Sequence, residues 1–241
     1  MPEHVCGFHF HEGAKLYYEI HGGGEPLILL HGNSEDCRIF DKMLPLLSAR
    51  YRVILADTRG HGRSDRGCPP LDFFTLAYDV RALMDHLNIQ SAHILGFSDG
   101  GNTALHLALK YPDSVRSLVL LGANLSPLGL CPIFQTLCIL AWGKLLGASL
   151  IFPSLRGKYE KLSLMVLHPN LPAKRLRQIT APALVMTGKR DFTVLKHETL
   201  RIARYLPDSA FVFLKGAGHF LPTSHPVETS RAVLRFLRHL G

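Results

Sequence analysis

The feature of the sequence that most constrains the fold is the pentapeptide Gly96-Phe97-Ser98-Asp99-Gly100. It follows the apolar run Ala92-His93-Ile94-Leu95 and precedes a segment with a helical pattern, residues 102–110. Glycines two positions before and two positions after a serine let the backbone make a tight, strained turn from a strand into a helix. Such a turn raises the hydroxyl above the edge of a sheet, so Ser98 is a candidate nucleophile. The alternative is that Ser98 only caps the helix.

Apolar runs and helical patterns alternate along most of the chain. Continuous apolar runs suit strands that helices cover on both faces, and the alternating segments 6–12 and 15–20 suit an antiparallel hairpin. The alternation of strands and helices predicts a doubly wound α/β fold with a mostly parallel sheet of about eight strands. The later predicted strands are 26–30, 52–56, 92–95, 116–121, 183–187 and 210–214, and the predicted helices are 37–47, 73–87, 102–110, 196–205 and 227–240.

One interval, residues 124–177, has no strand pattern, and prolines divide it into helical pieces. An excursion between two parallel strands lies above their carboxyl ends, where ligands bind in such folds. We therefore expect a short helical lid at 124–177, inserted after strand six of a single-domain core formed by 1–123 and 178–241. Its apolar side chains are candidates for a pocket lining, although packing on the core is the simpler expectation for most of them. They are Ile133, Phe134, Leu137, Ile139, Leu140, Trp142, Leu145 and Leu146.

The charge balance is basic, with a formal net charge of +8, and the excess lies in the second part of the chain. Residues 154–241 contain 15 Lys and Arg against 5 Asp and Glu. These cations are spread over several predicted elements, without interleaved aromatic residues or a groove-reading motif. We expect solvated helix faces and no nucleic-acid partner.

Cysteine usage and the chain start bear on location. The five cysteines are scattered and have no Cys-x-x-Cys spacing, which predicts free thiols rather than a disulfide framework or a zinc site. The start, Met1-Pro2-Glu3-His4, lacks the features of a signal peptide, so we expect a cytoplasmic protein.

Residues 133–152 are long and apolar enough to cross a bilayer, but Lys144 in their middle disfavours a membrane span. No feature predicts an oligomeric state.

The segment His9-Phe10-His11 places two imidazoles on one face of the first strand, as some metal sites do. No Asp, Glu or Cys neighbour completes a ligand set, so a solvated strand is the expectation. We expect neither a metal nor a cofactor.

A serine nucleophile needs a general base, and the base needs a partner that holds its tautomer. Asp191 lies in the loop after strand 183–187, and His219 lies in the glycine loop 216–220 after strand 210–214. Both positions are carboxyl ends of predicted parallel strands, so the two side chains should approach Ser98. The alternatives are that Asp191 caps the next helix and that His219 is an ordinary loop histidine.

Cleavage of an acyl group also needs donors for the developing oxyanion. The backbone N–H of Asp99 follows the nucleophile at a helix N-terminus, where the helix dipole favours an anion. The backbone N–H of Asn33, in the loop after strand 26–30, is the candidate second donor. That loop can also be a plain turn before a helix.

Taken together, these motifs make the chain resemble the α/β-hydrolase family over nearly its whole length, especially small esterase-like and C–C-hydrolase-like members with a lid after strand six. The resemblance implies Ser98 as nucleophile, His219 as base and Asp191 as acid, with Asn33 and Asp99 as oxyanion-hole donors. The motifs are His31-Gly32, Asp57-Thr58-Arg59-Gly60-His61-Gly62-Arg63-Ser64, Gly96-Phe97-Ser98-Asp99-Gly100-Gly101, Gly188-Lys189-Arg190-Asp191 and Gly216-Ala217-Gly218-His219-Phe220.

The resemblance also separates roles within the family. Asp57, Arg59 and His61 correspond to a structural turn near the site. Relatives with the acid after strand six would carry a carboxylate near Asn124, so the asparagine favours Asp191. A serine nucleophile argues against dehalogenase-like and epoxide-hydrolase-like chemistry, in which the nucleophile is an aspartate.

These residues predict a serine hydrolase that cleaves a small to medium carboxylic ester through an acyl-enzyme on Ser98. The expected partner is an apolar, ester-like small molecule in a pocket formed by Phe97, Phe134, Trp142 and Phe220. One alternative is hydrolysis of a C–C bond in a β-diketone-like ring-cleavage product by the same residues, although the lid is short for many such enzymes. Another is a ligand-binding protein that retains only the fold.

Overall fold

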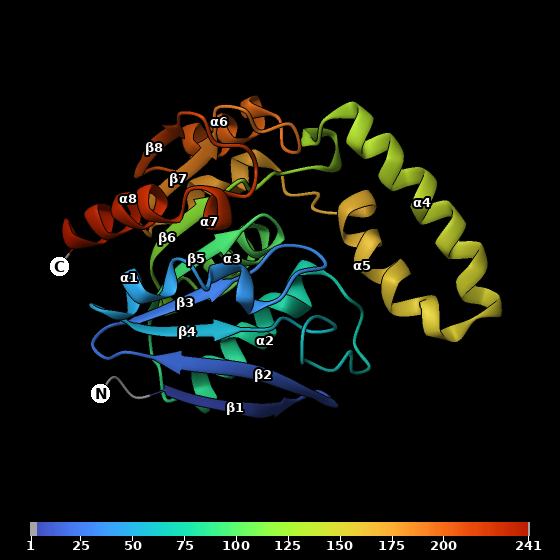
Figure 1. Cartoon of the computed structure of the whole chain (residues 1–241), viewed down its shortest axis with the longest axis horizontal. Coiled ribbons are helices and arrows are strands. Elements are labelled where there is room, and N and C mark those ends of the chain that lie inside the picture. Colours follow the sequence, from blue (N-terminus) through green and yellow to red (C-terminus); the bar gives the residue numbers. More distant parts are fainter. Residues whose placement is uncertain (1–3, 241) are drawn as a thin grey trace.

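The computed structural model describes residues 4–240 and contains an eight-stranded sheet with the order β1-β2-β4-β3-β5-β6-β7-β8 (Figure 1). β2 pairs antiparallel with β1 and with β4, and every other neighbouring pair is parallel. This confirms the predicted doubly wound sheet. Residues 1–3, on which the absence of a signal peptide was partly judged, lie outside the described residues. The strands are β1 (His4–His11), β2 (Ala14–His21), β3 (Pro26–Leu30), β4 (Arg52–Ala56), β5 (Ala92–Phe97), β6 (Val115–Leu121), β7 (Ala183–Gly188) and β8 (Ser209–Leu214).

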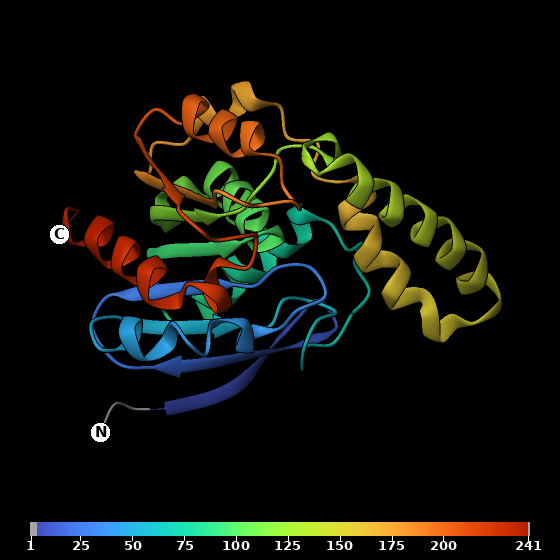
Figure 2. The same cartoon turned by 45° about the horizontal axis from the view of Figure 1, so that its top comes forward.

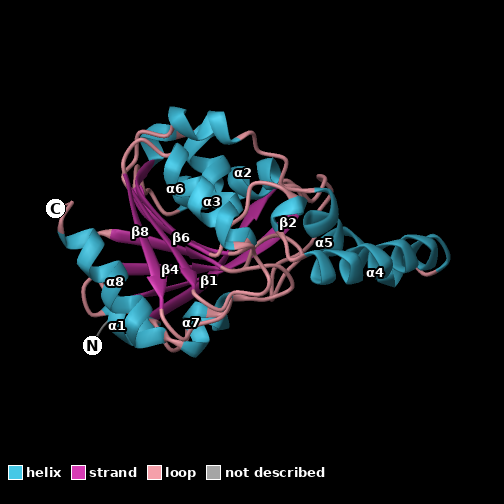
Figure 3. Cartoon of the chain, turned by 90° about the horizontal axis from the view of Figure 1, so that it is seen from above, coloured by secondary structure: helices cyan, strands magenta, loops and turns pink. Residues whose placement is uncertain are grey.

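Helices cover both faces of the sheet and create two cores (Figure 3). α2, α3 and α6 pack on one face, and α1, α7 and α8 pack on the other. The alternation of side chains along a strand explains the two cores: Ile28 and Leu30 of β3 belong to the first, whereas Leu27 and Leu29 belong to the second. The helices are α1 (Leu44–Ser48), α2 (Phe73–His86), α3 (Asp99–Lys110), α6 (Lys196–Tyr205), α7 (Leu221–Ser224) and α8 (Pro226–Arg238).

Two predicted helices differ from the observed ones. The predicted helix 37–47 is divided into a 3-10 turn, Cys37–Phe40, and the short α1, because Pro45 at the start of α1 cannot continue a helix from before it. The helix predicted from residue 102 begins earlier, at Asp99, directly after Ser98. The second difference brings a helix N-terminus to the candidate nucleophile.

The expectation of a solvated strand is wrong for His9. The side chain is buried, and its ring stacks on His86 of α2 at a centroid distance of 5.6 Å. Burial, with the nearby charges of other histidines and Arg59, lowers the pKa of His9 to about 4. α2 packs across the β1–β2 hairpin. The sequence pattern of one strand does not show which element will cover it.

The turn that follows β4 is held by buried polar groups. The Asp57 carboxylate accepts hydrogen bonds from the backbone N–H groups of Cys37 and Arg63, both at 2.8 Å. The Arg59 side chain is fully buried, and its Nε donates to Asp79 of α2 at 2.8 Å. These contacts position the loop beside the carboxyl end of β3, as expected for a structural turn.

Between β6 and β7 the chain forms two long helices, α4 (Pro132–Ile151) and α5 (Arg156–Leu167), which pack on each other and project from the sheet (Figures 1 and 2). The ends of the interval predicted as a lid pack on the sheet, since Leu125 and Leu171 belong to the core that also contains Ile28 and Leu30. The expected packing of most α4 side chains on that core is wrong. α4 extends past the edge of the sheet and meets protein mainly on its α5 side, so Leu137 and Leu140 are exposed.

Gly100 should be intolerant of any side chain. A Cβ there would lie 2.0 Å from the carbonyl oxygen of Leu30, so α3 would have to move away from β3. We expect Gly100→Ala to lower the free energy of unfolding by about 1–3 kcal/mol, measured by urea denaturation. Gly143→Ala in α4 is the matched control, because a Cβ there meets no atom within 4 Å. Equal midpoints for Gly100→Ala and the unsubstituted protein would contradict the close packing.

Candidate active site

Ser98 occupies a strained turn between β5 and α3. Its φ of 52° and ψ of −118° place a residue with a side chain in the region that favours glycine. A Cβ on Gly96 would lie 2.3 Å from the carbonyl oxygen of Gly100, so the turn closes only if this position has no side chain. Strain of this kind costs about 1–3 kcal/mol and persists only where surrounding structure enforces it. The Gly-x-Ser-x-Gly spacing therefore has a direct steric cause.

The structure brings Ser98, His219 and Asp191 into one hydrogen-bonded line. His219 Nε2 lies 3.2 Å from Ser98 Oγ, and His219 Nδ1 lies 2.8 Å from Asp191 Oδ2. The three residues follow β5, β8 and β7, whose carboxyl ends meet at the same edge of the sheet. The arrangement has the geometry of a nucleophile, a base and an orienting acid.

Asp191 is held as a carboxylate by its surroundings. Its Oδ1 accepts hydrogen bonds from the backbone N–H groups of Thr193 and Val194, at 2.8 and 2.9 Å. Burial opposes ionisation, yet the hydrogen bonds from His219 and from the two backbone groups hold the pKa of Asp191 below its ordinary value. An ionised Asp191 fixes the imidazole with a proton on Nδ1, which leaves Nε2 as the basic nitrogen toward Ser98.

The loop after β6 supports the histidine without supplying an acid. A Cβ on Gly122 would lie 2.9 Å from His219 Cε1, so the absence of a side chain makes room for the imidazole. Asn124 points into another network, in which its Oδ1 accepts from Asn102 Nδ2 at 3.2 Å. The position after the sixth strand therefore contributes space rather than a charge.

Two backbone donors border the serine. Within residues 4–240, the backbone N–H groups of Asn33 and Asp99 donate to no other protein atom. The Asn33 side chain ties this region together, because its Nδ2 donates to Asp99 Oδ2 at 2.9 Å and to the carbonyl oxygen of Lys161 in α5 at 2.7 Å. Burial raises the pKa of Asp99 to about 6, against the effect of the bond from Asn33.

A cavity of about 230 Å³ opens beside Ser98 and His219. Of the four predicted pocket residues, Phe97, Phe134 and Phe220 line it. The sequence analysis did not predict four other lining side chains. They are Ser34, Glu35, Met165 and Thr193.

Trp142 does not line this cavity. Its Nε1 donates to Ser163 Oγ at 2.9 Å, and its ring stacks on Tyr159 at 5.9 Å, so it joins α4 to α5. Phe134 lies near the start of α4, whereas Trp142 follows eight residues later, about 12 Å along the helix axis. Its place in the pocket was an incorrect prediction because the sequence did not show in which direction α4 leaves the sheet.

Glu35 is the unexpected ionisable group of the cavity. Its Oε2 accepts a hydrogen bond from the Gly32 backbone N–H at 2.9 Å. A Cβ built on Gly32 would lie 2.8 Å from this oxygen and 3.1 Å from Ser98 Cβ, so the carboxyl group and the serine are within about 6 Å of each other. Burial raises the pKa of Glu35 to about 7, although the Gly32 bond opposes the rise.

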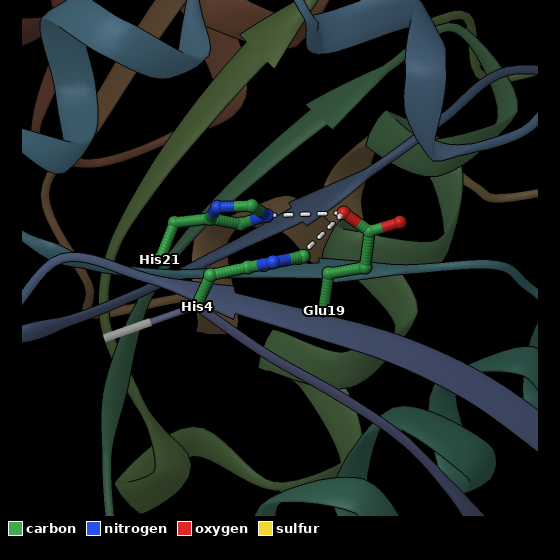
Figure 4. Close-up of side chains that lie close together, drawn as sticks. All are labelled: His4, Glu19 and His21. Carbon is green, nitrogen blue, oxygen red and sulfur yellow. Dashed lines mark hydrogen bonds and ion pairs between the residues drawn. The ribbon is translucent and has the colours of Figure 1, made fainter. Parts of the chain in front are cut away.

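Two groups of described residues have the spacing of metal ligands, and neither lines the cavity. His4 and His21 face each other across β1 and β2 with stacked rings, and Glu19 Oε2 lies 3.0 Å from His21 Nε2 (Figure 4). The second group, Asp36, Cys37 and Asp57, belongs to the turn described above, where Asp57 already accepts two backbone hydrogen bonds.

Residues 25–137 match a family model of the alpha/beta hydrolase fold. The chain is also 30% identical to the dihydrolipoyllysine-residue acetyltransferase component of an acetoin cleaving system from Pseudomonas putida, over 94% of this chain and 68% of that relative. The chain belongs to the α/β-hydrolase fold family. Its lid-bearing sheet and the strand-end positions of Ser98, Asp191 and His219 agree with that membership.

Other relatives of this α/β hydrolase carry different activities in their names. It is 38% identical to a protein named carbamate hydrolase RutD from Azorhizobium caulinodans, but the match spans only 45% of this chain and 41% of that relative. It is 26% identical to a 2-hydroxy-6-oxo-6-phenylhexa-2,4-dienoate hydrolase from Comamonas testosteroni, over 92% of this chain and 91% of that relative.

Solved structures agree with this assignment. A hydrolase from Pseudomonas aeruginosa superposes with a TM-score of 0.80 at 27% identity, over 96% of this chain and 98% of that one. Est816, described as an N-acyl homoserine lactone degrading enzyme, superposes with a TM-score of 0.78 at 25% identity, over 97% and 100%. The fold thus matches over nearly the whole length of the chain.

The raised pKa of Glu35 predicts a pH dependence of stability. A carboxyl group whose pKa is higher in the folded chain binds more protons when folded, so its contribution to the free energy of unfolding falls as the pH rises from about 4.5 to about 7. The fall should amount to at most about 3 kcal/mol. Glu35→Gln removes this titrating group. In urea denaturation, the difference in the free energy of unfolding between the unsubstituted protein and the variant should therefore decrease as the pH rises through this range.

The matched control for Glu35→Gln is Asp113→Asn, at an exposed carboxyl group outside the cavity. This control should retain the decline with pH. Parallel stability curves for the unsubstituted protein and Glu35→Gln would show that Glu35 ionises as it does in the unfolded chain.

Proposed function

We propose that this protein is a cofactor-independent serine hydrolase of a small or medium carboxylic ester. The observation that carries the proposal is the line from Ser98 Oγ through the His219 imidazole to the Asp191 carboxylate, at the wall of a cavity. A hydroxyl, a base and an orienting acid at these distances are the groups that acyl transfer through a covalent intermediate requires.

In the first half of the reaction, Ser98 Oγ attacks the acyl carbon while His219 Nε2 takes the serine proton. Asp191 stabilises the imidazolium that forms. The carbonyl oxygen becomes an oxyanion, for which the backbone N–H groups of Asn33 and Asp99 are the proposed donors. His219 then gives its proton to the leaving alcohol, and the acyl group remains on Ser98.

In the second half, His219 takes a proton from a water molecule, which attacks the acyl carbon of the Ser98 ester. A second oxyanion forms between the same two N–H groups. Its collapse releases the carboxylic acid, and the proton on His219 returns to Ser98 Oγ. The residues are then in their starting state, and one water molecule has been consumed.

The cavity favours a neutral substrate. Among the described residues that line it, three are phenylalanines, none is a lysine or arginine, and Glu35 alone has a carboxyl group. A dienoate of the kind named for the Comamonas testosteroni relative carries a carboxylate, which an ionised Glu35 would repel and no lining cation would balance. Hydrolysis of a C–C bond by the same residues is therefore the second candidate, supported by the 26% identity to that relative.

Replacement of the nucleophile tests the proposal directly. Ser98→Ala should lower the turnover of p-nitrophenyl acetate and butyrate by about four to six orders of magnitude, because the covalent step is lost. A fluorophosphonate probe should label the unsubstituted protein on Ser98 and leave the variant unlabelled. Ser91→Ala, at the other end of β5, is the matched control and should keep full activity. Undiminished turnover by a folded Ser98→Ala variant would refute the assignment.

A substrate panel separates the two candidate reactions. We expect kcat/KM on p-nitrophenyl esters to pass through a maximum with acyl length as the chain fills the cavity. A ring-cleavage dienoate should react at least about a hundredfold more slowly, and Glu35→Gln should narrow the gap by removing a negative charge. Uniformly low ester rates with fast dienoate turnover would instead support C–C bond hydrolysis.

A further inference from the structure

α4 carries an apolar face that the protein leaves uncovered. Ile133, Leu137, Leu140 and Ile151 are 74%, 60%, 59% and 72% exposed. Their separations of four, three and eleven residues place them on one side of the helix, together with Lys144, and we call these five residues the α4 stripe. Isolated exposed leucines are common on protein surfaces, but exposed apolar side chains that share one helix face are a candidate interaction site.

The opposite side of α4 is already occupied. Cys138 is buried there, and Trp142 is bonded to Ser163 of α5. α4 spans 20 residues, and an 18-residue window of it has a mean hydropathy of 1.5, with 6% of that window buried in the protein. A helix that is apolar on all sides normally lies inside a protein core or in lipid. Here α5 covers one side, and the sheet does not reach the other.

The charges of the α4–α5 hairpin are mostly cationic, and Lys144 lies in the stripe itself. The hairpin of α4 and α5 contains Lys144, Arg156, Lys158 and Lys161 against a single carboxylate, Glu160. Glu160 is already paired with Arg66 and Arg156, at 2.5 and 3.1 Å. Within residues 4–240, Lys144 and Lys158 lie within 4 Å of no carboxylate. An apolar surface with unneutralised lysines is complementary to lipid tails and anionic headgroups.

We propose that the α4 stripe docks this protein onto an anionic phospholipid surface. The helix lies in the interface rather than across the bilayer, because α5 returns from its far end and carries Arg156, Lys158, Glu160 and Lys161, which are costly in hydrocarbon. Lys144 reaches from the stripe to headgroup phosphates on its long apolar stem.

In the docked orientation the membrane lies close to the candidate active site. Phe134 at the start of α4 and Met165 in α5 both line the cavity beside Ser98. A lipid surface on the outer side of α4 would thus lie one helix away from the cavity. Figures 1 and 2 show the hairpin projecting from the sheet, with α5 nearer to the sheet than most of α4.

Flotation with vesicles tests the proposal on the full chain. We expect binding to vesicles of phosphatidylcholine mixed with phosphatidylglycerol, at least tenfold weaker binding to phosphatidylcholine alone, and loss of binding at high salt. Leu137→Glu with Leu140→Glu should weaken binding at least tenfold. Phe10→Glu with Phe74→Glu is the matched control at exposed phenylalanines outside the hairpin and should bind as the unsubstituted protein does. Lys144→Gln and Lys158→Gln should each cost about fivefold on anionic vesicles.

The single tryptophan of the chain provides a direct reporter. In the variant Trp142→Phe with Leu140→Trp, the only indole lies in the α4 stripe, and its emission should shift to the blue and be quenched by brominated lipids when vesicles are added. Trp142→Phe with Phe10→Trp is the control and should show neither change. Ser98→Ala should bind vesicles like the unsubstituted protein, so docking and chemistry are tested separately.

Two outcomes would overturn the proposal. One is the absence of both flotation and the emission change with anionic vesicles. The other is a dimer in sedimentation velocity that Leu137→Glu with Leu140→Glu dissociates, without any vesicle binding, which would assign the α4 stripe to contact between two copies of this chain.

Discussion

The close approach of α3 to the end of β3 is the contact on which the site depends. Gly100 brings the helix backbone so near the Leu30 carbonyl that no side chain fits between them, and Gly96 allows the strand to turn directly into that helix. Ser98 is left between the two glycines in a backbone conformation that it would not adopt alone. The packing of α3 on the sheet therefore supplies the free energy that holds the serine hydroxyl above the sheet edge.

Around this turn, electrostatics divides three carboxyl groups into different roles. Asp191 receives hydrogen bonds from Thr187, Thr193, Val194 and His219 that favour its charged form, whereas burial raises the pKa of Asp99 to about 6 and of Glu35 to about 7. Asp191 thus orients His219, whereas the ionisation states of Asp99 and Glu35 set the net charge near the imidazole. Asn33 links this charge arrangement to the lid, since one amide group binds both Asp99 and the α5 backbone. A movement of α5 would be transmitted to the loop that carries the candidate oxyanion donor.

The sequence predicted the elements that have a local cause. The predicted strands 26–30 and 52–56 match the observed bounds, because a strand that is buried on both faces appears in the sequence as a continuous apolar run. The strand-end positions of Ser98, Asp191 and His219 followed from the same pattern, since parallel strands bring their carboxyl ends to one edge. Glu35 and Met165 escaped prediction, because an isolated glutamate in a loop and a methionine in a helix have no motif. They become cavity residues only because the fold places them beside Ser98.

α4 is the element whose surroundings the sequence left open. The sequence predicted helical pieces within 124–177 and a long apolar stretch at 133–152, but such a stretch suits a core helix, a pocket wall or a lipid-facing helix, and the choice depends on which elements lie beside it. The sequence by itself determined the α/β class, the order of the strands along the chain and the strand-end positions of Ser98, Asp191 and His219, because these follow from periodicity and local sterics. Only the tertiary structure decided that Trp142 joins two helices, that Glu35 enters the cavity and that the α4 stripe faces outward, because each of these depends on the direction in which distant elements pack.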